Sequence, residues 1–294
     1  MQKNISIIIP AKNEAKNLSI LLPKLKKLHP EITINIVNDG STDNTVEICQ
    51  KFKVNIISHP YSKGNGAAIK TGARSIKSDI IIFMDADGQH KPEDISCLLK
   101  KLDSGYDMVI GARSSSSQAS LLRRIANGFY NKLASFMTGF KIDDLTSGFR
   151  AVKRDKFIKF LYLLPNGFSY PTTCTMAFFR SGFSVAYVPI IAAQREGKSH
   201  ISLLKDGLKF LTIILKIGAL FSPMRLFLPI SSALFITGLS YYGYTFITEH
   251  RFTNMSGLLF SSSLIIFLMG ILSEQISALH YKGMDQPSIT IKDS

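Results

Sequence analysis

The sequence contains no tryptophan and only three cysteines among its 294 residues. Cys49, Cys97 and Cys174 lie far apart, so they form no metal-ligand pattern and are typical of buried thiols in a reducing compartment. No Gly-x-Gly-x-x-Gly motif follows the first predicted strand, residues 5–9, which disfavours a nicotinamide-binding oxidoreductase. The N-terminus lacks the basic, apolar and small-residue segments of a signal peptide. We therefore expect the soluble part of the chain to remain in the cytoplasm.

Acidic residues are also scarce: 21 acids stand against 35 lysines and arginines, which gives a formal net charge of +14. Such an excess favours anionic partners, namely nucleic acid, phosphorylated substrates or an acidic lipid surface. Hydrophobic residues make up 46% of the chain, and the excess is concentrated near the C-terminus. This composition indicates a soluble domain joined to a membrane part.

The first 110 residues alternate short apolar runs with helical patterns. We predict strands at residues 5–9, 32–37, 54–57 and 106–110, and another strand that ends at Asp85. This alternation predicts an α/β fold with an open, mainly parallel sheet covered on both faces. In such sheets, ligands bind outside the carboxyl ends of the strands. Polar clusters follow three of those ends, at residues 10–14, 38–43 and 85–89, so we expect a site at this edge.

Two carboxylates, one residue apart, follow the apolar run that begins at Ile80. Because side chains alternate along a strand, Asp85 and Asp87 can converge at its end. Two hard oxygen ligands, together with an oxygen from Gln89, suit Mg²⁺ or Mn²⁺ holding a diphosphate. The alternative is an ordinary turn, because aspartate and glycine often follow strands.

Charged residues continue beyond the predicted sheet. The segment 121–140 is predicted to be helical and carries Arg123 and Arg124, whose alternative interpretation is exposed helix charge. Residues 143–150 place an acid, a glycine turn and a base within eight residues. Residues 195–200 form a basic loop, for which the alternative is ordinary solvated charge.

The pattern becomes that of a membrane protein from Ile201 onward. Leucines and isoleucines interleaved with lysines predict a basic amphipathic helix in the membrane interface, with a plain surface helix as the alternative. Residues 226–247 contain no charge and are long enough to span a bilayer, for which about 20 residues suffice. Residues 258–279 form a second, weaker span.

The distribution of positive charge predicts how the two spans are oriented. Lysines and arginines precede the first span and follow the second, whereas the connecting turn holds only Arg251. The positive-inside rule therefore puts both ends of a transmembrane hairpin in the cytoplasm. Serines and glycines on the spans would let them pack against neighbouring copies in a homo-oligomer. The expected organisation is a catalytic domain at residues 1–200, an interfacial helix at 201–223, a two-helix transmembrane hairpin at 224–282 and a cytoplasmic tail at 283–294.

Four segments resemble, in order and spacing, the signatures of family 2 glycosyltransferases. They are Pro-Ala-Lys-Asn-Glu at 10–14, Val-Asn-Asp-Gly-Ser-Thr-Asp at 37–43, Asp-Ala-Asp-Gly-Gln-His at 85–90 and Asp-Leu-Thr-Ser-Gly-Phe-Arg at 144–150. With two C-terminal spans, the chain is similar to the polyprenyl-phosphate glycosyltransferases, the subgroup of dolichol-phosphate mannose synthase and bacterial undecaprenyl-phosphate glucosyltransferases. The resemblance implies an inverting enzyme with a GT-A fold. It would move one hexose, of glucose or mannose type, from a nucleotide-diphosphate sugar to undecaprenyl or dolichyl phosphate at the cytoplasmic membrane face, with no nucleic acid partner.

The resemblance also implies roles for individual residues. The nucleotide sugar would be bound by Pro10, Lys12, Glu14, Val37, Asp39, Asp85 and Ala86, and Asp39 would accept a hydrogen bond from the base or ribose. The metal, Mg²⁺ or Mn²⁺, would be bound by Asp85, Asp87 and Gln89. The catalytic roles would belong to Asp87, Arg113 and Asp144. The diphosphate and the lipid phosphate would be contacted by Arg123, Arg124, Arg150, Arg195 and Lys198.

Asp144 is the candidate for positioning or for weak base work, and its alternative is a helix cap or a structural partner of Arg150. A phosphate acceptor needs little general base, because its second pKa is about 6. The chain departs from the family pattern at Lys12, where an aromatic residue is usual, and at Asn38, which replaces the first of two common aspartates.

Two other protein classes are alternatives to this resemblance. A processive polysaccharide synthase would carry a Gln-x-x-Arg-Trp stretch and more spans, and this chain has no tryptophan. A membrane scaffold that keeps the fold without the chemistry is the non-enzymatic alternative. The presence of both Asp85 and Asp87 favours the enzyme.

Overall fold

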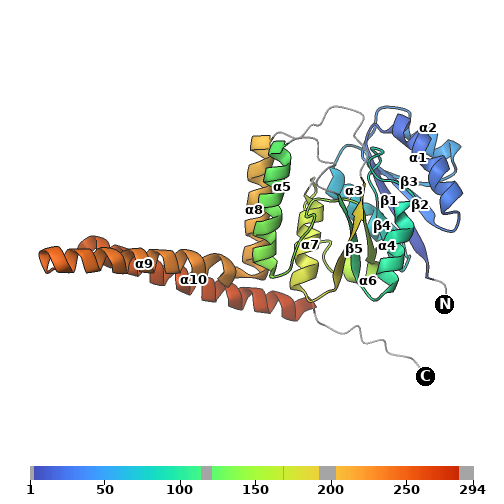
Figure 1. Cartoon of the computed structure of the whole chain (residues 1–294). Coiled ribbons are helices and arrows are strands. Elements are labelled where there is room, and N and C mark those ends of the chain that lie inside the picture. Colours follow the sequence, from blue (N-terminus) through green and yellow to red (C-terminus); the bar gives the residue numbers. More distant parts are fainter. Residues whose placement is uncertain (1–2, 114–120, 168, 192–202, 285–294) are drawn as a thin grey trace, which may run out of the picture. The chain divides into compact units, whose positions relative to one another are not determined.

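The computed structural model describes residues 3–113, 121–167, 169–191 and 203–284. Its strands are β1 (Ile5–Ala11), β2 (Thr33–Asn38), β3 (Asn55–Ser58), β4 (Ile80–Phe83), β5 (Met108–Arg113), β6 (Arg150–Lys153) and β7 (Val185–Ile190). Its helices are α1 (Ala15–Leu28), α2 (Thr45–Lys51), α3 (Asn65–Ser75), α4 (Asp94–Asp103), α5 (Leu121–Thr138), α6 (Arg154–Ile158), α7 (Tyr170–Arg180), α8 (Leu203–Phe221), α9 (Pro223–Glu249) and α10 (Asn254–Met284) (Figure 1). The described residues form two compact units, one from 1–135 and 140–214, the other from 136–139 and 215–294.

The first unit is built on a seven-stranded sheet in the order β3-β2-β1-β4-β6-β5-β7. All strands run in one direction except β6, which is antiparallel to both β4 and β5. The predicted α/β fold with a mainly parallel sheet is therefore confirmed. The sequence patterns do not predict β6, because its four residues have a charged residue at each end and only two apolar residues between them.

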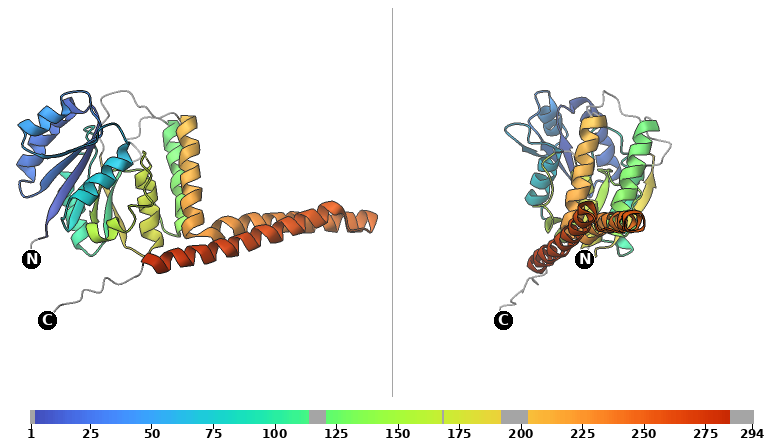
Figure 2. Two further views of the ribbon diagram at one scale, coloured as in Figure 1. Left: turned by 180° about the vertical axis from the view of Figure 1, so that it is seen from behind. Right: turned by 90° about the vertical axis from the view of Figure 1, so that its left-hand side faces the viewer.

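Both faces of this sheet are buried, as strands of a parallel sheet require. Ile7 and Ile9 of β1 belong to a core cluster with Leu22 of α1 and residues of α4. Ile8 points to the other face, where α3 packs so closely that a Cβ at Gly72 would lie 2.6 Å from Ile8 Cγ2. Figures 1 and 2 show α1 and α4 on one face of the sheet and α3 and α7 on the other. The strands are thus held rigidly from both sides, and the loops at their carboxyl ends are left to carry function.

The second unit is dominated by α9 and α10, which run side by side as a helical hairpin (Figure 2). Both helices are long and apolar enough to cross a membrane, and only 11% and 17% of their most apolar windows are buried. The core helix of a soluble protein would be mostly buried, so the outward apolar surface fits membrane anchoring. Between the helices, Ser263 Oγ donates to the carbonyl oxygen of Ser231 at 2.9 Å, and Gly238 packs against Leu259 and Phe260.

Candidate active site

The loops after β1 and β2 are joined by hydrogen bonds at the carboxyl edge of the sheet. The two strands are parallel neighbours, and Ala11 pairs in register with Asn38, so the loops begin side by side. The backbone N–H of Asn13 donates to Ser41 Oγ at 2.9 Å, and Asn13 Oδ1 accepts from the N–H of Thr42 at 2.8 Å. Asn13 adopts a left-handed backbone conformation, with φ of 57°, to make these contacts. Two of the three predicted polar clusters therefore form one continuous surface.

Asp39 lies at the end of β2 and is almost fully buried. Its Oδ1 accepts from His59 Nδ1 and from the backbone N–H of Lys63, both at 2.8 Å. Its Oδ2 accepts from Ser62 Oγ at 2.8 Å and from the N–H of Gly64 at 2.9 Å. Burial opposes ionisation, yet these donors lower the pKa of Asp39 below its ordinary value. A carboxylate offers about four acceptor positions, and here the protein fills four, so the structure gives no support to a direct contact with base or ribose.

Asp85 and Asp87 follow β4, and both are half-buried. Asp85 Oδ2 lies 3.4 Å from Nε2 of His90, whose ring stacks on Phe149 with a centroid separation of 4.9 Å. Although burial works against the charged form, His90 and the positive charge of Arg113 lower the pKa of Asp85. Asp85 is therefore an ionised carboxylate with 31% of its side chain still exposed to receive a ligand.

Gly148 closes the space beside Asp85. A Cβ on Gly148 would lie only 2.6 Å from Asp85 Oδ2, so the backbone of the loop before β6 lies directly against the carboxylate. Among the described residues, no group of three or more histidine, cysteine, aspartate or glutamate side chains could hold a metal ion. The predicted set, Asp85, Asp87 and the amide Gln89, supplies hard oxygen ligands that fit Mg²⁺ or Mn²⁺. With only two carboxylates, it would leave further coordination positions for phosphate oxygens and water.

Arg113 ends β5 and is bound through two of its nitrogens by Asp144. Arg113 Nε lies 2.8 Å from Asp144 Oδ2 and Nη2 lies 3.0 Å from Oδ1, while Nη2 also donates to Thr146 Oγ1 at 2.6 Å. Desolvation by burial is opposed by this pairing, which lowers the pKa of Asp144 and raises that of Arg113. The alternative that Asp144 pairs with Arg150 is wrong, because its partner is Arg113. A carboxylate with a lowered pKa and both oxygens engaged is a weak base, so the geometry favours a positioning role.

Arg150 is fully buried, although phosphate contact was predicted for it. Its guanidinium donates to the carbonyl oxygen of Ser147, and to Pro171 O and Thr175 Oγ1, each at 3.3 Å. The aromatic ring of Tyr170 lies 5.8 Å from its guanidinium carbon. This side chain is enclosed and hydrogen-bonded by protein, so the structure does not support a phosphate contact by Arg150.

The structure does not describe the side chains of the other predicted basic residues. Arg123 and Arg124 lie near the start of α5, but their side chains lie outside the described set. Arg195 and Lys198 lie outside the described residues. The phosphate-contacting set therefore stays a prediction.

The remaining predicted nucleotide-binding residues lie in β1 and β2 or in the loops that follow β1 and β4. Pro10 is half-buried in β1, Val37 is fully buried in β2, and Ala86 is buried between the two acids. Glu14 accepts from Asn17 Nδ2 at 2.6 Å. Exposed Lys12 donates to Ser62 Oγ at 3.1 Å, which connects the β1 loop to the β3 loop.

Sequence reasoning missed the loop after β3, residues 59–64, which we call the β3 loop. It supplies His59, Ser62, Lys63 and Gly64 to Asp39, and His59 Nε2 also lies 2.9 Å from Thr71 Oγ1. The signal was present, because a fourth strand end, at residues 59–64, reads His-Pro-Tyr-Ser-Lys-Gly and is as polar as the other three.

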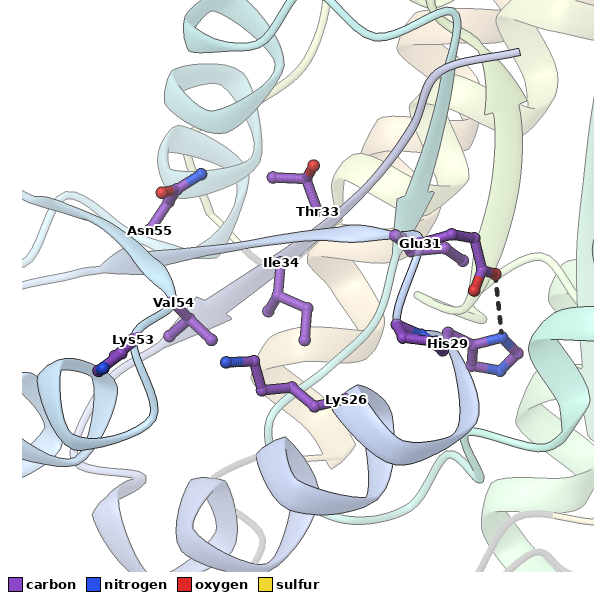
Figure 3. Close-up of a pocket in the computed structure, with 10 residues that line it drawn as sticks. Lys26, His29, Glu31, Thr33, Ile34, Lys53, Val54 and Asn55 are labelled. Carbon is purple, nitrogen blue, oxygen red and sulfur yellow. Dashed lines mark ion pairs between the residues drawn. The ribbon is translucent and has the colours of Figure 1, made fainter. Parts of the chain in front are cut away.

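A separate pocket of about 310 Å³ lies at the opposite edge of the sheet (Figure 3). It is lined by the end of α1 and the starts of β2 and β3, including Lys26, His29 and Glu31. Lys26 Nζ donates to the carbonyl oxygen of Phe52, and His29 Nδ1 lies 3.8 Å from Glu31 Oε1. At about 3.3 Å per residue, the six residues of β2 separate this pocket from the carboxyl edge by roughly 15–20 Å. The acids, the Arg113–Asp144 pair and the polar loops all lie at the carboxyl edge, which is therefore the candidate active site.

Comparison with known proteins agrees with this geometry. The model of glycosyl transferase family 2 matches residues 6–161, and the model of the GtrB C-terminal hairpin matches residues 222–279. The chain is 30% identical over 212 residues to polyprenol monophosphomannose synthase of Mycolicibacterium smegmatis, which covers 67% of this chain and 80% of that protein. It is 34% identical over 162 residues to undecaprenyl-phosphate 4-deoxy-4-formamido-L-arabinose transferase of Photorhabdus laumondii, covering 52% of this chain and 50% of that protein.

Among solved structures, glucosyl-3-phosphoglycerate synthase of Mycobacterium tuberculosis, crystallised with Mn²⁺, UDP and its product, is similar with a TM-score of 0.62. That likeness has 18% identity, covers 74% of this chain and 80% of the other, and supports the GT-A fold alone. The chain belongs to glycosyl transferase family 2 and, within it, to the polyprenyl-phosphate glycosyltransferase subgroup, as the four motifs predicted.

Proposed function

We propose that this protein transfers one hexose, of glucose or mannose type, from a nucleotide-diphosphate sugar to a polyprenyl phosphate at the cytoplasmic face of a membrane. The observation that carries the proposal is a half-buried pair of acids, Asp85 and Asp87, beside an oriented arginine in a chain with a two-helix apolar hairpin. The names of the two relatives, a polyprenol monophosphomannose synthase and an undecaprenyl-phosphate sugar transferase, support this acceptor class.

The acidic edge would bind the donor diphosphate through a divalent metal. Asp85, Asp87 and Gln89 would hold Mg²⁺ or Mn²⁺, which when bound neutralises charge on the leaving nucleotide diphosphate. The low pKa of Asp85 keeps it ionised and ready to bind a cation at neutral pH. The Mn²⁺ in the solved structural neighbour supports divalent metal use in this fold.

The transfer needs one bond to form and one to break. An oxygen of the lipid phosphate attacks the anomeric carbon, while the bond from that carbon to the diphosphate oxygen breaks and the nucleotide diphosphate leaves. The attacking phosphate is already largely ionised at pH 7, since its second pKa is about 6, so no strong base is required. Arg113, fixed in direction by Asp144, would face the negative charge that develops on the diphosphate.

The hairpin would bring this site to the lipid acceptor. Lysines and arginines precede the first apolar span, residues 226–247, and follow the second, residues 258–279, whereas the turn between the helices carries Arg251 alone. By the positive-inside rule, both ends of the hairpin would lie in the cytoplasm, together with the first unit. The acceptor phosphate would then be reached from the cytoplasmic leaflet.

The test is transfer of radiolabel from UDP-glucose and GDP-mannose into butanol-extractable lipid by membranes that contain the protein. We expect one donor to label lipid, and we expect Asp87→Asn to abolish labelling. The matched control is Asp103→Asn, an exposed carboxylate at the end of α4 that pairs with Lys3 and should leave labelling unchanged. If neither donor labels lipid above the Asp87→Asn background, the proposal is wrong for these hexoses. Absence of metal-dependent nucleotide binding as well would favour a non-catalytic scaffold.

A further inference from the structure

The order of the sheet sets the direction in which a bound nucleotide must extend, if the proposed function holds. β4, which carries Asp85 and Asp87, lies between β1 and β6. On the β6 side, the space beside Asp85 is closed by Gly148, where an added Cβ would lie 2.6 Å from Asp85 Oδ2. A diphosphate held at the acids therefore has its nucleoside on the other side, over the loops that follow β1, β2 and β3.

A nucleobase in that position needs a flat apolar surface, because every base has a π face that stacks on aromatic side chains. Within the described loops after β1 to β4, residues 12–14, 39–44, 59–64 and 84–93, Tyr61 is the only aromatic side chain that is more than one-third exposed. It is 67% exposed, whereas His59 and His90 are 7% and 5% exposed. Tyr61 belongs to the β3 loop.

The backbone around Tyr61 is fixed, although the residue itself is largely exposed. Asp39 accepts hydrogen bonds from Ser62, Lys63 and Gly64, the three residues that follow Tyr61. On the other side, a Cβ at Gly40 would lie 2.8 Å from the carbonyl carbon of Tyr61, so this backbone packs against the end of β2. An aromatic ring presented on an ordered loop loses little conformational freedom when a ligand binds.

Positive charge lies close to this ring. Lys63 Nζ is 5.6 Å from the ring centroid of Tyr61, and Lys12 Nζ hydrogen-bonds Ser62, the next residue along the chain. This combination of a π surface with two nearby cations suits a phosphate-bearing nucleotide better than a neutral aromatic ligand.

We propose that Tyr61 is the stacking platform for the nucleobase of the sugar donor, and that Asp39 positions this platform through the β3 loop instead of contacting the nucleoside. The inference deepens the proposed function and depends on it. It assigns a binding role to a residue that the sequence motifs did not single out.

The first test compares two probes, a nucleoside diphosphate and inorganic diphosphate, each with Mn²⁺, by isothermal titration calorimetry on the full-length protein. UDP and GDP are both tried, and the one that wild type binds is used. Tyr61→Ala should weaken nucleotide binding by about 5- to 100-fold, the range expected for loss of one base–aromatic stack. It should leave inorganic diphosphate binding unchanged, since that probe has no base. Tyr61→Phe keeps the ring and should stay within about twofold of wild type.

The second test uses the absence of tryptophan from the natural chain. Tyr61→Trp makes a protein with a single indole, whose fluorescence should change when the nucleotide binds and stay constant when inorganic diphosphate binds. The control is Tyr106→Trp, two residues before β5 and therefore at the opposite edge of the sheet, which should not respond to either probe.

Each outcome bears on one proposal. If wild type binds neither nucleotide with Mn²⁺, the proposed function fails before Tyr61 is tested. If wild type binds but Tyr61→Ala binds equally well, Tyr61 is not the platform. An equal loss for nucleotide and inorganic diphosphate would also overturn the inference, because it would indicate a general effect on the loop.

Discussion

Replacing Gly148 with alanine should weaken metal binding at Asp85 and Asp87 without unfolding the protein. The φ of Gly148 lies outside the left-handed region, so an alanine can adopt its backbone conformation. The new methyl group, however, would lie 2.6 Å from Asp85 Oδ2, whereas ordinary van der Waals contact begins near 3.4 Å. Because the Asp85 side chain is 31% exposed, it can turn away from the methyl group without disrupting the core.

The size of the effect follows from that displacement. The carboxylate must retreat by roughly 0.8 Å, while metal–ligand distances tolerate only about 0.2 Å. Disturbing the surroundings of a metal ligand typically costs about 10- to 100-fold in affinity or activity. We therefore expect Gly148→Ala to weaken Mn²⁺ binding in the presence of nucleotide by about 10- to 100-fold, and sugar transfer at limiting metal by a similar factor.

The assay is titration of Mn²⁺, with free Mn²⁺ followed by electron paramagnetic resonance, on protein saturated with nucleotide diphosphate. Gly128→Ala is the matched control, since Gly128 is exposed on α5 and its Cβ would meet no atom within 4 Å. That substitution should leave Mn²⁺ affinity unchanged and slightly stabilise the helix. Wild-type Mn²⁺ affinity in Gly148→Ala would refute the argument that Asp85 is a metal ligand held in place by this glycine.

Three further predictions concern the charged groups. Asp144→Asn should reduce transfer at least tenfold and destabilise the fold by about 2 kcal/mol, because it leaves Arg113 without its charged partner. Transfer assays and thermal unfolding in detergent measure the two effects. Wild-type values for both would contradict the positioning role of Asp144. Because the pKa of Asp39 is lowered from 3.8, its ionised form stabilises the fold fully above about pH 4, and this contribution is lost as the pH falls further. Thermal unfolding midpoints measured from pH 7 to 2.5 should therefore drop more steeply in acid for wild type than for Asp39→Asn. Arg150→Met should lower the free energy of unfolding by about 2–4 kcal/mol and leave the Mn²⁺ affinity of the folded protein unchanged, since the guanidinium hydrogen-bonds within the core. Loss of lipid-phosphate binding with unchanged stability would instead support the predicted phosphate contact of Arg150.

Local sequence patterns were sufficient to predict the architecture, because strands and membrane spans depend on runs of apolar residues that can be read within a single segment. Uninterrupted β-branched runs, such as Ile80–Phe83 in β4, are buried on both faces. The charge-free stretch 226–247 lies within α9, and the second apolar stretch, 258–279, whose one charged residue is Glu274, lies within α10. Polar loops after parallel strands were expected at one edge, and the pairing of Ala11 with Asn38 puts the first two side by side.

Hydrogen-bond partners were not predictable in the same way, because they depend on contacts between distant segments. Asp39 was expected to face the nucleoside, yet it is saturated by a loop that begins 20 residues later. From the sequence, Arg150 was a possible structural partner of Asp144, because it lies only six residues away. In the structure, Asp144 pairs instead with Arg113, at the end of β5. Arg150 is charged, and charged residues are usually exposed. Its burial is explained by acceptors that the fold supplies, which the sequence alone does not reveal: the carbonyl oxygens of Ser147 and Pro171, the hydroxyl of Thr175 and the sulfur of Met108.

The antiparallel direction of β6 affects how the active edge is assembled during folding. Because β6 runs opposite to its neighbours, the loop that precedes it, rather than the loop that follows it, reaches the carboxyl edge with Gly148 and Asp144. Residues 5–90 already contain the acids and the loops proposed for the nucleoside, but they lack this closing segment. A nascent chain that has not yet paired β6 with β4 would carry Asp85 and Asp87, the proposed metal ligands, without Gly148 and Asp144 beside them. Catalytic competence is thus tied to completion of the sheet centre, so an incompletely folded enzyme would not consume donor.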